Sequence, residues 1–235
     1  MSPFIGEFMG TMLLIILGDG VVANVVLNKT KGQNSGWIVI TFGWAMAVFL
    51  GVYASLKLGG SGHLNPAVTI AMTAFADFDS SLLVTYIGAQ FAGAIAGATI
   101  VWLAYKQHFA ATIDKDLKLA VFCNAPAIRS LGNNLVTEII GTFVLVFGAL
   151  AMSPAASTLG SLDALPVGLL VLGIGLGLGG PTGYAINPAR DLGPRIAHFI
   201  LPIPGKRDSD WGYSWIPVLG PIVGALIAAY LFKLL

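Results

Sequence analysis

Six long apolar stretches, separated by polar connections, run through the whole sequence. Each is close to the ~20 residues that an α-helix needs to cross the hydrocarbon core of a bilayer. The chain is 56% hydrophobic and 10% charged, whereas an average soluble domain carries about 25% charged residues. In lipid, backbone N–H and C=O groups must be paired within the protein, so spanning segments of this length are helices. We therefore predict an all-α membrane protein whose spanning helices cover residues 4–27, 37–58, 81–105, 133–153, 162–180 and 214–234.

Two further apolar stretches, residues 65–76 and 187–199, are only about half as long as a full span, a length typical of re-entrant segments. Each begins with the same tripeptide. Proline suits the first turn of a helix, where its missing N–H is not needed, and the asparagine before it can cap the helix. We predict two half-helices that begin inside the membrane, at the boxes Asn65-Pro66-Ala67 and Asn187-Pro188-Ala189.

The chain also repeats itself. Residues 7–14 (EFMGTMLL) match residues 138–145 (EIIGTFVL), and residues 88–94 match 219–225 at the same offset, with one Asn-Pro-Ala box between each pair. Each half contains three predicted spans, so the second copy enters the membrane from the opposite side. This pattern predicts inverted three-helix repeats within a single channel domain, residues 1–235. The predicted parts are a first repeat at 1–105, a connecting loop at 106–132 and a second repeat at 133–235.

Two half-helices that enter from opposite faces would meet end to end near the middle of the bilayer. Their positive amino ends would then point at one place, which disfavours cations there. The amides of Asn65 and Asn187 could donate to a passing hydroxyl group. A lone Asn-Pro-Ala is usually an ordinary helix start, but a pair in inverted repeats favours a pore.

The segments 61–69 (SGHLNPAVT) and 183–194 (GYAINPARDLGP) resemble the signature boxes of the major intrinsic proteins, the family of aquaporins and glycerol facilitators. The resemblance covers essentially the whole chain. The aspartate directly after the arginine of the second box, Asp191 after Arg190, resembles glycerol facilitators more than water-selective aquaporins. The resemblance implies an aquaporin-like right-handed bundle of six spanning helices and two re-entrant half-helices. It also implies a homotetramer in the cell membrane, with one pore per subunit, cytoplasmic termini and no cofactor or metal.

The function implied by the resemblance is passive diffusion of glycerol and other small uncharged solutes, with some water, while ions and protons are excluded. By position, the family's selectivity filter corresponds to Trp44, Gly175, Tyr184 and Arg190. Two aromatic rings would face the carbons of a polyol, and the arginine would donate to its hydroxyls. Gly175 would supply width. For Trp44 alone, a packing or interfacial role would be the simpler interpretation.

Glu7 and Glu138 occupy equivalent positions near the start of the first and fourth spans. Intramembrane carboxylates are costly and usually functional. In the family, the equivalent residues accept hydrogen bonds from loop N–H groups and so turn a row of carbonyls toward the pore, a role that we favour over a proton relay. The corresponding carbonyls are those of Gly62, His63, Leu64, Gly183, Tyr184 and Ala185.

Asp19 departs from the family pattern, which usually has an uncharged residue between these glycines. At 1.5 Å per residue it lies about 22 Å into the first helix, near the extracellular side. It is either an interfacial carboxylate, the interpretation that we favour, or a vestibule charge that alters which solutes enter.

Charge bias conflicts with the family's orientation. Lys57 and Lys233 alone lie on the side of the termini, whereas the other connections are basic. The positive-inside rule would therefore place both termini outside, while the family has them in the cytoplasm; we follow the family. The basic residues on the opposite side are Lys29, Lys31, Lys106, Lys115, Lys118, Arg129, Arg195, Lys206 and Arg207.

Other function classes find less support. A proton-coupled transporter could use Glu7, Asp19 or Glu138 as a relay, but no span pairs an acid with a base. An enzyme is not expected, because no nucleophile has a base at suitable spacing and His63, His108 and His198 are scattered. One cysteine, Cys123, excludes an internal disulfide, and a net charge of +1 argues against nucleic acid. The expected partners are therefore membrane lipid and small neutral solutes, with undissociated lactic acid a credible cargo.

Overall fold

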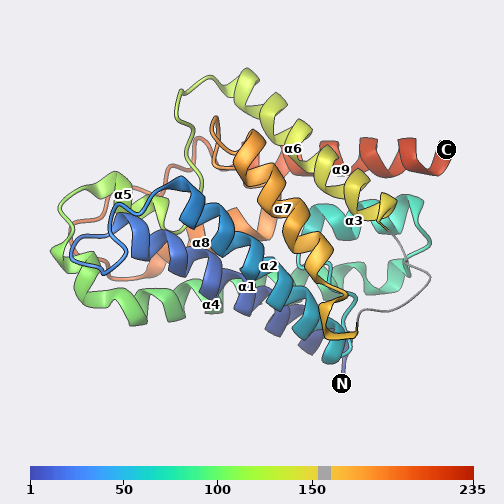
Figure 1. Cartoon of the computed structure of the whole chain (residues 1–235), viewed down its shortest axis with the longest axis horizontal. Helices are drawn as coiled ribbons and strands as arrows, with labels where there is room; N and C mark the ends of the chain where they lie inside the picture. Colours follow the sequence, from blue (N-terminus) through green and yellow to red (C-terminus); the bar gives the residue numbers. More distant parts are fainter. Residues whose placement is uncertain (153–159) are drawn as a thin grey trace.

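The computed structural model describes residues 1–152 and 160–235 and is helical, with no strand among these residues. Figure 1 shows some helices running along the long axis of the molecule and others crossing it obliquely. Two 3₁₀ helices, η1 (Ser80–Leu82) and η2 (Gly160–Leu162), connect longer elements. The α-helices of the described residues are α1 (Pro3–Val26), α2 (Trp37–Lys57), α3 (Pro66–Phe75), α4 (Leu83–Ala111), α5 (Lys115–Ala120), α6 (Leu131–Ala151), α7 (Leu165–Leu178), α8 (Pro188–Ile200) and α9 (Ile216–Leu234).

Five helical segments are long and apolar enough to cross a membrane, namely α1, α2, η1 with α4, α6 and α9. They correspond to five of the six predicted spans, although α4 continues to Ala111, six residues beyond the predicted end. Ser153, the predicted last residue of the fourth span, lies outside the described residues. The number, length and apolar composition of these helices identify a multi-pass membrane protein.

The predicted span at 162–180 is shorter in the structure than expected. Helix α7 has 14 residues, about 21 Å at 1.5 Å per residue, which is less than the ~30 Å core of a bilayer. Pro166 lies in its first turn, and two glycines, Gly179 and Gly180, follow its last residue. Proline favours a helix start and glycine a helix end, so local chemistry limits this helix at both ends.

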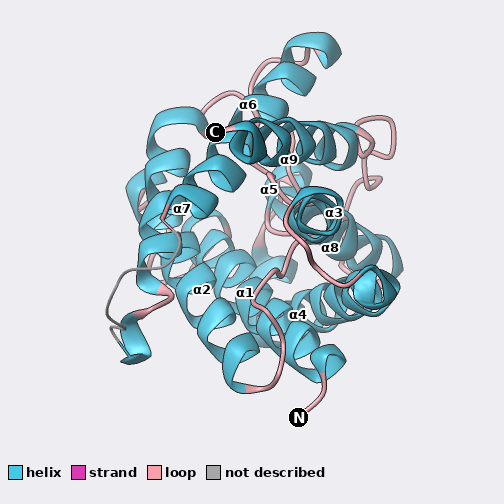
Figure 2. Ribbon diagram, turned by 90° about the vertical axis from the view of Figure 1, so that its right-hand side faces the viewer, coloured by secondary structure: helices cyan, strands magenta, loops and turns pink. Residues whose placement is uncertain are grey.

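The two half-helices lie where the Asn-Pro-Ala boxes predict them. Helix α3 begins at Pro66 and α8 begins at Pro188, each after an asparagine cap. Helix α3 packs mainly on α9, and α8 packs mainly on α4. Figure 2 shows the longer helices arranged around this central pair. Helix α5 was not predicted; the Asp114 side chain caps it by accepting from the N–H groups of Asp116 and Leu117.

Close glycine contacts repeat between the two halves. A Cβ atom built on Gly93 of α4 would lie 2.3 Å from the carbonyl oxygen of Phe8 in α1. A Cβ atom built on Gly224 of α9 would lie 2.3 Å from the carbonyl oxygen of Ile139 in α6. Gly224 lies 131 positions after Gly93, and Ile139 lies 131 positions after Phe8, which is the offset between the two sequence repeats. In lipid, such close backbone approach supplies the van der Waals packing that holds helices together.

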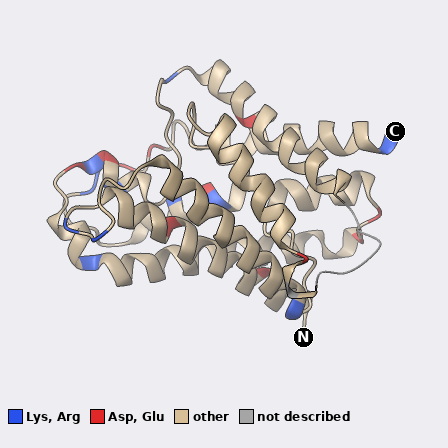
Figure 3. Ribbon diagram, viewed as in Figure 1, with Lys and Arg blue, Asp and Glu red and all other residues tan. Residues whose placement is uncertain are grey.

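Both termini lie at one end of the molecule, and the basic connections lie at the other (Figures 1 and 3). Some of these cations have structural partners. The Lys206 ammonium donates to the carbonyls of His198, Phe199 and Leu201 at the end of α8, and the Lys118 ammonium donates to that of Pro204. Burial lowers the pKa of both lysines. The charge bias is therefore due in part to lysines that bind carbonyl groups at and after the end of α8.

Candidate pore

The two asparagines of the boxes join the amino ends of α3 and α8. The side-chain oxygen of Asn65 accepts from the N–H of Ala67 at 2.9 Å, and that of Asn187 accepts from the N–H of Ala189 at 3.0 Å. Each side-chain nitrogen then donates across the junction: Asn65 to the Ile186 carbonyl and Asn187 to the Leu64 carbonyl, both at 2.8 Å. An amide nitrogen carries two N–H groups, so each asparagine keeps one for another acceptor.

The loops before the boxes have an unusual backbone. Leu64 and Ile186, which directly precede the asparagines, have φ of 50° and 44°, and Tyr184 has φ of 43°. This left-handed region is unfavourable for side chains of this size, at about 1–3 kcal/mol for each residue. Surrounding contacts must therefore hold the loops in place.

Glu7 and Glu138 provide these contacts. Glu7 accepts from the N–H groups of His63 at 3.1 Å and Leu64 at 2.7 Å. Glu138 accepts from those of Ala185 at 3.1 Å and Ile186 at 2.8 Å. Both carboxylates are buried. Each carboxylate fixes two successive N–H groups of its loop. The loop carbonyls do not bind the carboxylate and are left for other donors.

The first carboxylate has further donors. The Ser55 hydroxyl donates to Glu7 Oε1 at 2.9 Å, and the Gln90 amide donates to Glu7 Oε2 at 2.8 Å. The same Ser55 oxygen accepts from the Gly62 N–H at 3.1 Å. Gln90 also donates to the Thr69 hydroxyl at 3.0 Å. With this many donors, the Glu7 carboxylate is stabilised as a hydrogen-bond acceptor, and none of its lone pairs is left free to take part in a proton path.

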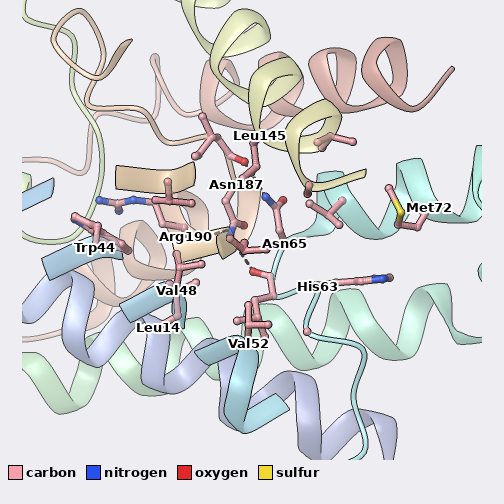
Figure 4. A pocket seen from close by; sticks show the side chains of 18 of the residues that line it. Leu14, Trp44, Val48, Val52, His63, Asn65, Met72, Leu145, Asn187 and Arg190 are labelled. Carbon is pink, nitrogen blue, oxygen red and sulfur yellow. Dashed lines mark hydrogen bonds between the residues drawn. The ribbon is translucent and has the colours of Figure 1, made fainter. Parts of the chain in front are cut away.

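A cavity of about 270 Å³ runs past the junction of the two half-helices. In Figure 4, Trp44 and Arg190 lie at one end, the two asparagines in the middle, and His63 and Met72 at the other end. Apolar side chains such as Leu145 form part of the wall, and residues of both loops form another part. A path with apolar and hydrogen-bonding walls suits a molecule that has carbon on one side and hydroxyls on the other.

A second cavity, of about 190 Å³, adjoins the first. Three residues line both: Trp44, Tyr184 and Arg190. They come from three segments, namely α2, the loop before α8, and α8 itself. The residues common to two adjoining cavities form the boundary between them, and these three are among the four predicted filter residues.

Arg190 is held in place by contacts on several sides. Its guanidinium lies over the Trp44 ring, 4.1 Å from the ring centre, and its Nη1 donates to the Phe122 carbonyl at 3.3 Å. Nη1 also lies 3.7 Å from the carboxylate of Asp19. The side chain is 9% exposed. The remaining N–H groups can donate to a solute between the cavities, since an arginine has five.

Gly175 lies next to this boundary but lines neither cavity. A Cβ atom built on it would lie 2.9 Å from the Tyr184 ring and 3.0 Å from its hydroxyl oxygen. The glycine therefore gives room to the Tyr184 side chain rather than directly to a solute. Trp37 completes the contact: its indole N–H donates to the Gly175 carbonyl at 3.0 Å, and its ring packs edge-on against Tyr184.

Asp191, which directly follows Arg190, forms a buried ion pair with Arg195. Arg195 donates to both carboxylate oxygens of Asp191, at 2.8 and 3.1 Å. The same pair binds the backbone of Asn124, whose N–H donates to Asp191 and whose carbonyl accepts from Arg195. It thus anchors the segment that carries Phe122, whose carbonyl binds Arg190. Within the described residues, no group of three His, Cys, Asp or Glu side chains could hold a metal ion.

Asp19 is fully buried in the structure and lines neither cavity. Its position therefore fits neither an interfacial carboxylate nor a charge exposed in a vestibule. Its partner is Arg190, which comes from a segment more than 150 residues away.

Sequence reasoning missed several residues of the site. Ile186, rather than Ala185, is the counterpart of Leu64, because the carbonyl of each accepts a hydrogen bond from the asparagine side chain of the other box. Trp37 lines the smaller cavity. Two tryptophans seven residues apart lie on one face of a helix, so the spacing of Trp37 and Trp44 could have indicated it. No sequence signal points to the Phe122 carbonyl.

Comparison with known proteins gives consistent results. A model of the major intrinsic protein family matches residues 1–232. A probable glycerol uptake facilitator protein from Thermotoga maritima is 58% identical over 233 residues, covering 99% of each chain. A D/L-lactic acid transporter from Lactiplantibacillus plantarum is 44% identical over 230 residues, covering 96% of this chain and 94% of the other. The X-ray structure of the aquaglyceroporin from Plasmodium falciparum has a TM-score of 0.87 at 32% identity, covering 98% of this chain and 94% of that one.

Proposed function

The chain belongs to the major intrinsic protein family, and we propose that it conducts glycerol and other small uncharged solutes, with some water, passively across the cell membrane. It is a channel of this family with an aquaporin fold, not an enzyme. The observation that carries the proposal is the boundary formed by Trp44, Tyr184 and Arg190 between two adjoining cavities.

A polyol has a geometry that this boundary can accommodate. Its carbon atoms would contact the rings of Trp44 and Tyr184, and its hydroxyls would accept from Arg190. Farther along, the free amide N–H groups of Asn65 and Asn187 would donate to hydroxyls, and loop carbonyls would accept from them. Each hydrogen bond to water that the solute gives up is then replaced by one to the channel.

Ions would not pass by this route. The amino ends of α3 and α8 carry partial positive charge and meet beside the cavity, which disfavours cations and hydronium. An anion would lose its water against a largely apolar wall, which costs far more than the available hydrogen bonds return. A small organic acid would therefore pass in its undissociated form. Lactic acid is the acid that we propose, because a relative 44% identical to this chain is described as a D/L-lactic acid transporter.

A proton-coupled transporter is not favoured. Glu7 and Glu138 each accept two loop N–H groups, so they serve the backbone in the structure. We propose instead that both are scaffold residues. We further propose a homotetramer with one pore per subunit and cytoplasmic termini, built from repeats at residues 1–105 and 133–235 that are joined by the loop at 106–132.

The test is a shrink–swell assay by stopped-flow light scattering on liposomes that contain the purified protein. Water, glycerol and lactic acid are compared at several pH values, with empty liposomes as the control. We expect glycerol flux that rises linearly with concentration and is insensitive to a protonophore, and lactic acid flux that follows the undissociated fraction. Glycerol permeability equal to that of empty liposomes would overturn the proposal, and saturable, protonophore-sensitive flux would favour the transporter.

A further inference from the structure

Asp19 has an environment that is unusual for a carboxylate. It lies on α1 with no exposed surface, and neither of its oxygens has a hydrogen-bond partner among the described residues. The nearest cationic group is the Arg190 guanidinium, 3.7 Å from Oδ1. A buried charge is costly unless it is paired, so this carboxylate depends on the arginine.

The same part of α1 contacts another filter residue. A Cβ atom built on Gly18 would lie 2.2 Å from the Trp44 ring, so the ring lies directly against the α1 backbone. Arg190 in turn lies over that ring, 4.1 Å from its centre. Gly18 and Asp19 thus support the tryptophan and the arginine, although neither residue lines either cavity.

The charges near the filter form two pairs. Arg195 has its own carboxylate, Asp191, with two direct hydrogen bonds. Arg190 has Asp19, at a distance that is electrostatic rather than hydrogen-bonded. Each arginine near the pore is therefore matched by one acid, and the N–H groups of Arg190 are not consumed by its partner.

We propose that Asp19 is a positioning residue that sets the specificity of the filter. It holds the Arg190 guanidinium over Trp44 and offsets its positive charge, so that Arg190 binds neutral hydroxyl-bearing solutes without retaining carboxylate anions. A filter with an unmatched arginine would attract the ionised form of an organic acid, which would bind, fail to cross and obstruct the path. This inference rests on the proposed function.

The test measures anion inhibition of glycerol flux. Liposomes carry wild type, Asp19→Asn, Asp19→Ser or the matched control Thr11→Val. Thr11 is also a fully buried polar residue of α1 without a hydrogen-bond partner among the described residues, but it is two turns away from Asp19. Sodium formate at neutral pH is present at equal concentration on both sides and is compared with sodium gluconate, whose anion is larger. Each flux is normalised to that of the same variant without formate.

We expect formate to inhibit both Asp19 variants roughly tenfold more strongly than wild type or Thr11→Val, because the arginine then carries an unmatched charge in a poorly screened site. The inhibition should disappear in Asp19→Asn/Arg190→Ala, since the effect acts through the arginine. A purely structural role would lower flux without creating sensitivity to formate.

Formate sensitivity equal to that of wild type in either folded Asp19 variant would overturn the inference. If neither single variant folds but the double variant does, the charge pairing is supported; if the double variant also fails to fold, the pairing is overturned. Failure of the proposed function is a separate result, because wild-type protein would then conduct no glycerol at all.

Discussion

Glu7 and Glu138 bind the two half-helix loops in the same way, although they lie in different halves of the chain. Each carboxylate accepts two successive backbone N–H groups, at distances between 2.7 and 3.1 Å. The residues that supply the second N–H, Leu64 and Ile186, both have positive φ. The strained loop conformation and the buried charge therefore occur together in each half, and each depends on the other.

Replacing Glu138 by glutamine should destabilise the protein. The side-chain amide offers one acceptor instead of two, so one of the Ala185 and Ile186 N–H groups stays buried and unpaired, at a cost of about 1–3 kcal/mol. We expect a lower midpoint of thermal unfolding in detergent and reduced glycerol flux. Asp77→Asn is the control, because Asp77 is exposed and asparagine tolerates its positive φ. Equal melting of both variants would show that the carboxylate does not support the loop.

Replacing Arg190 by alanine should loosen selectivity. The boundary between the two cavities loses its donor and much of its bulk, so solutes larger than glycerol should pass faster relative to glycerol. Asp19 would be left buried without its partner, which should also reduce stability by roughly 3 kcal/mol. The measurement is the ratio of erythritol to glycerol permeability in liposomes. Arg207→Ala, at a partly exposed residue that forms ion pairs but lines neither cavity, should leave the ratio unchanged. An unchanged ratio for Arg190→Ala would refute the assignment.

Replacing Gly175 by histidine should suppress glycerol flux more than water flux. The new side chain would collide with the Tyr184 ring, which already occupies the space beside the glycine. The displaced ring would narrow the boundary, and the larger solute would be affected first. Gly173→His is a matched control on the same helix, because a Cβ atom there meets nothing within 4 Å. If Gly175→His conducts glycerol as well as the control does, the filter has been misplaced.

Replacing Gly224 by alanine should weaken the packing of α6 against α9. The added methyl group would overlap the Ile139 carbonyl, and overpacking of this kind costs about 1–3 kcal/mol. Gly93→Ala should do the same to α1 and α4. The control is Gly88→Ala, where a Cβ atom meets nothing within 4 Å and the better helix propensity of alanine applies. Unfolding midpoints of the three variants test the prediction, and a Gly224 variant as stable as the control would contradict it.

Much of the fold could be predicted from local chemistry. The starts of α3 and α8 follow from the asparagine cap and the proline after it, and the structure has both helices beginning at those prolines. The bounds of most long helices follow from apolar length, because a bilayer requires about 20 residues for each span. Helix α7 was predicted too long, since the predicted span of 162–180 included three residues before the helix and the two glycines that end it.

The contacts of the site could be predicted only in part. Trp44, Tyr184 and Arg190 were identified because their positions match those of the family's filter, and the structure brings them together. The tertiary structure alone decided that Asp19 meets Arg190, that the Phe122 carbonyl binds the same guanidinium, and that the Tyr184 ring fills the space beside Gly175. A helix in lipid is apolar on its outer face as well as its inner one, so its sequence pattern does not tell which face turns inward. The sequence by itself determined which segments enter the membrane and where two of them begin; which side chains meet was decided by the rotation and close approach of the packed helices.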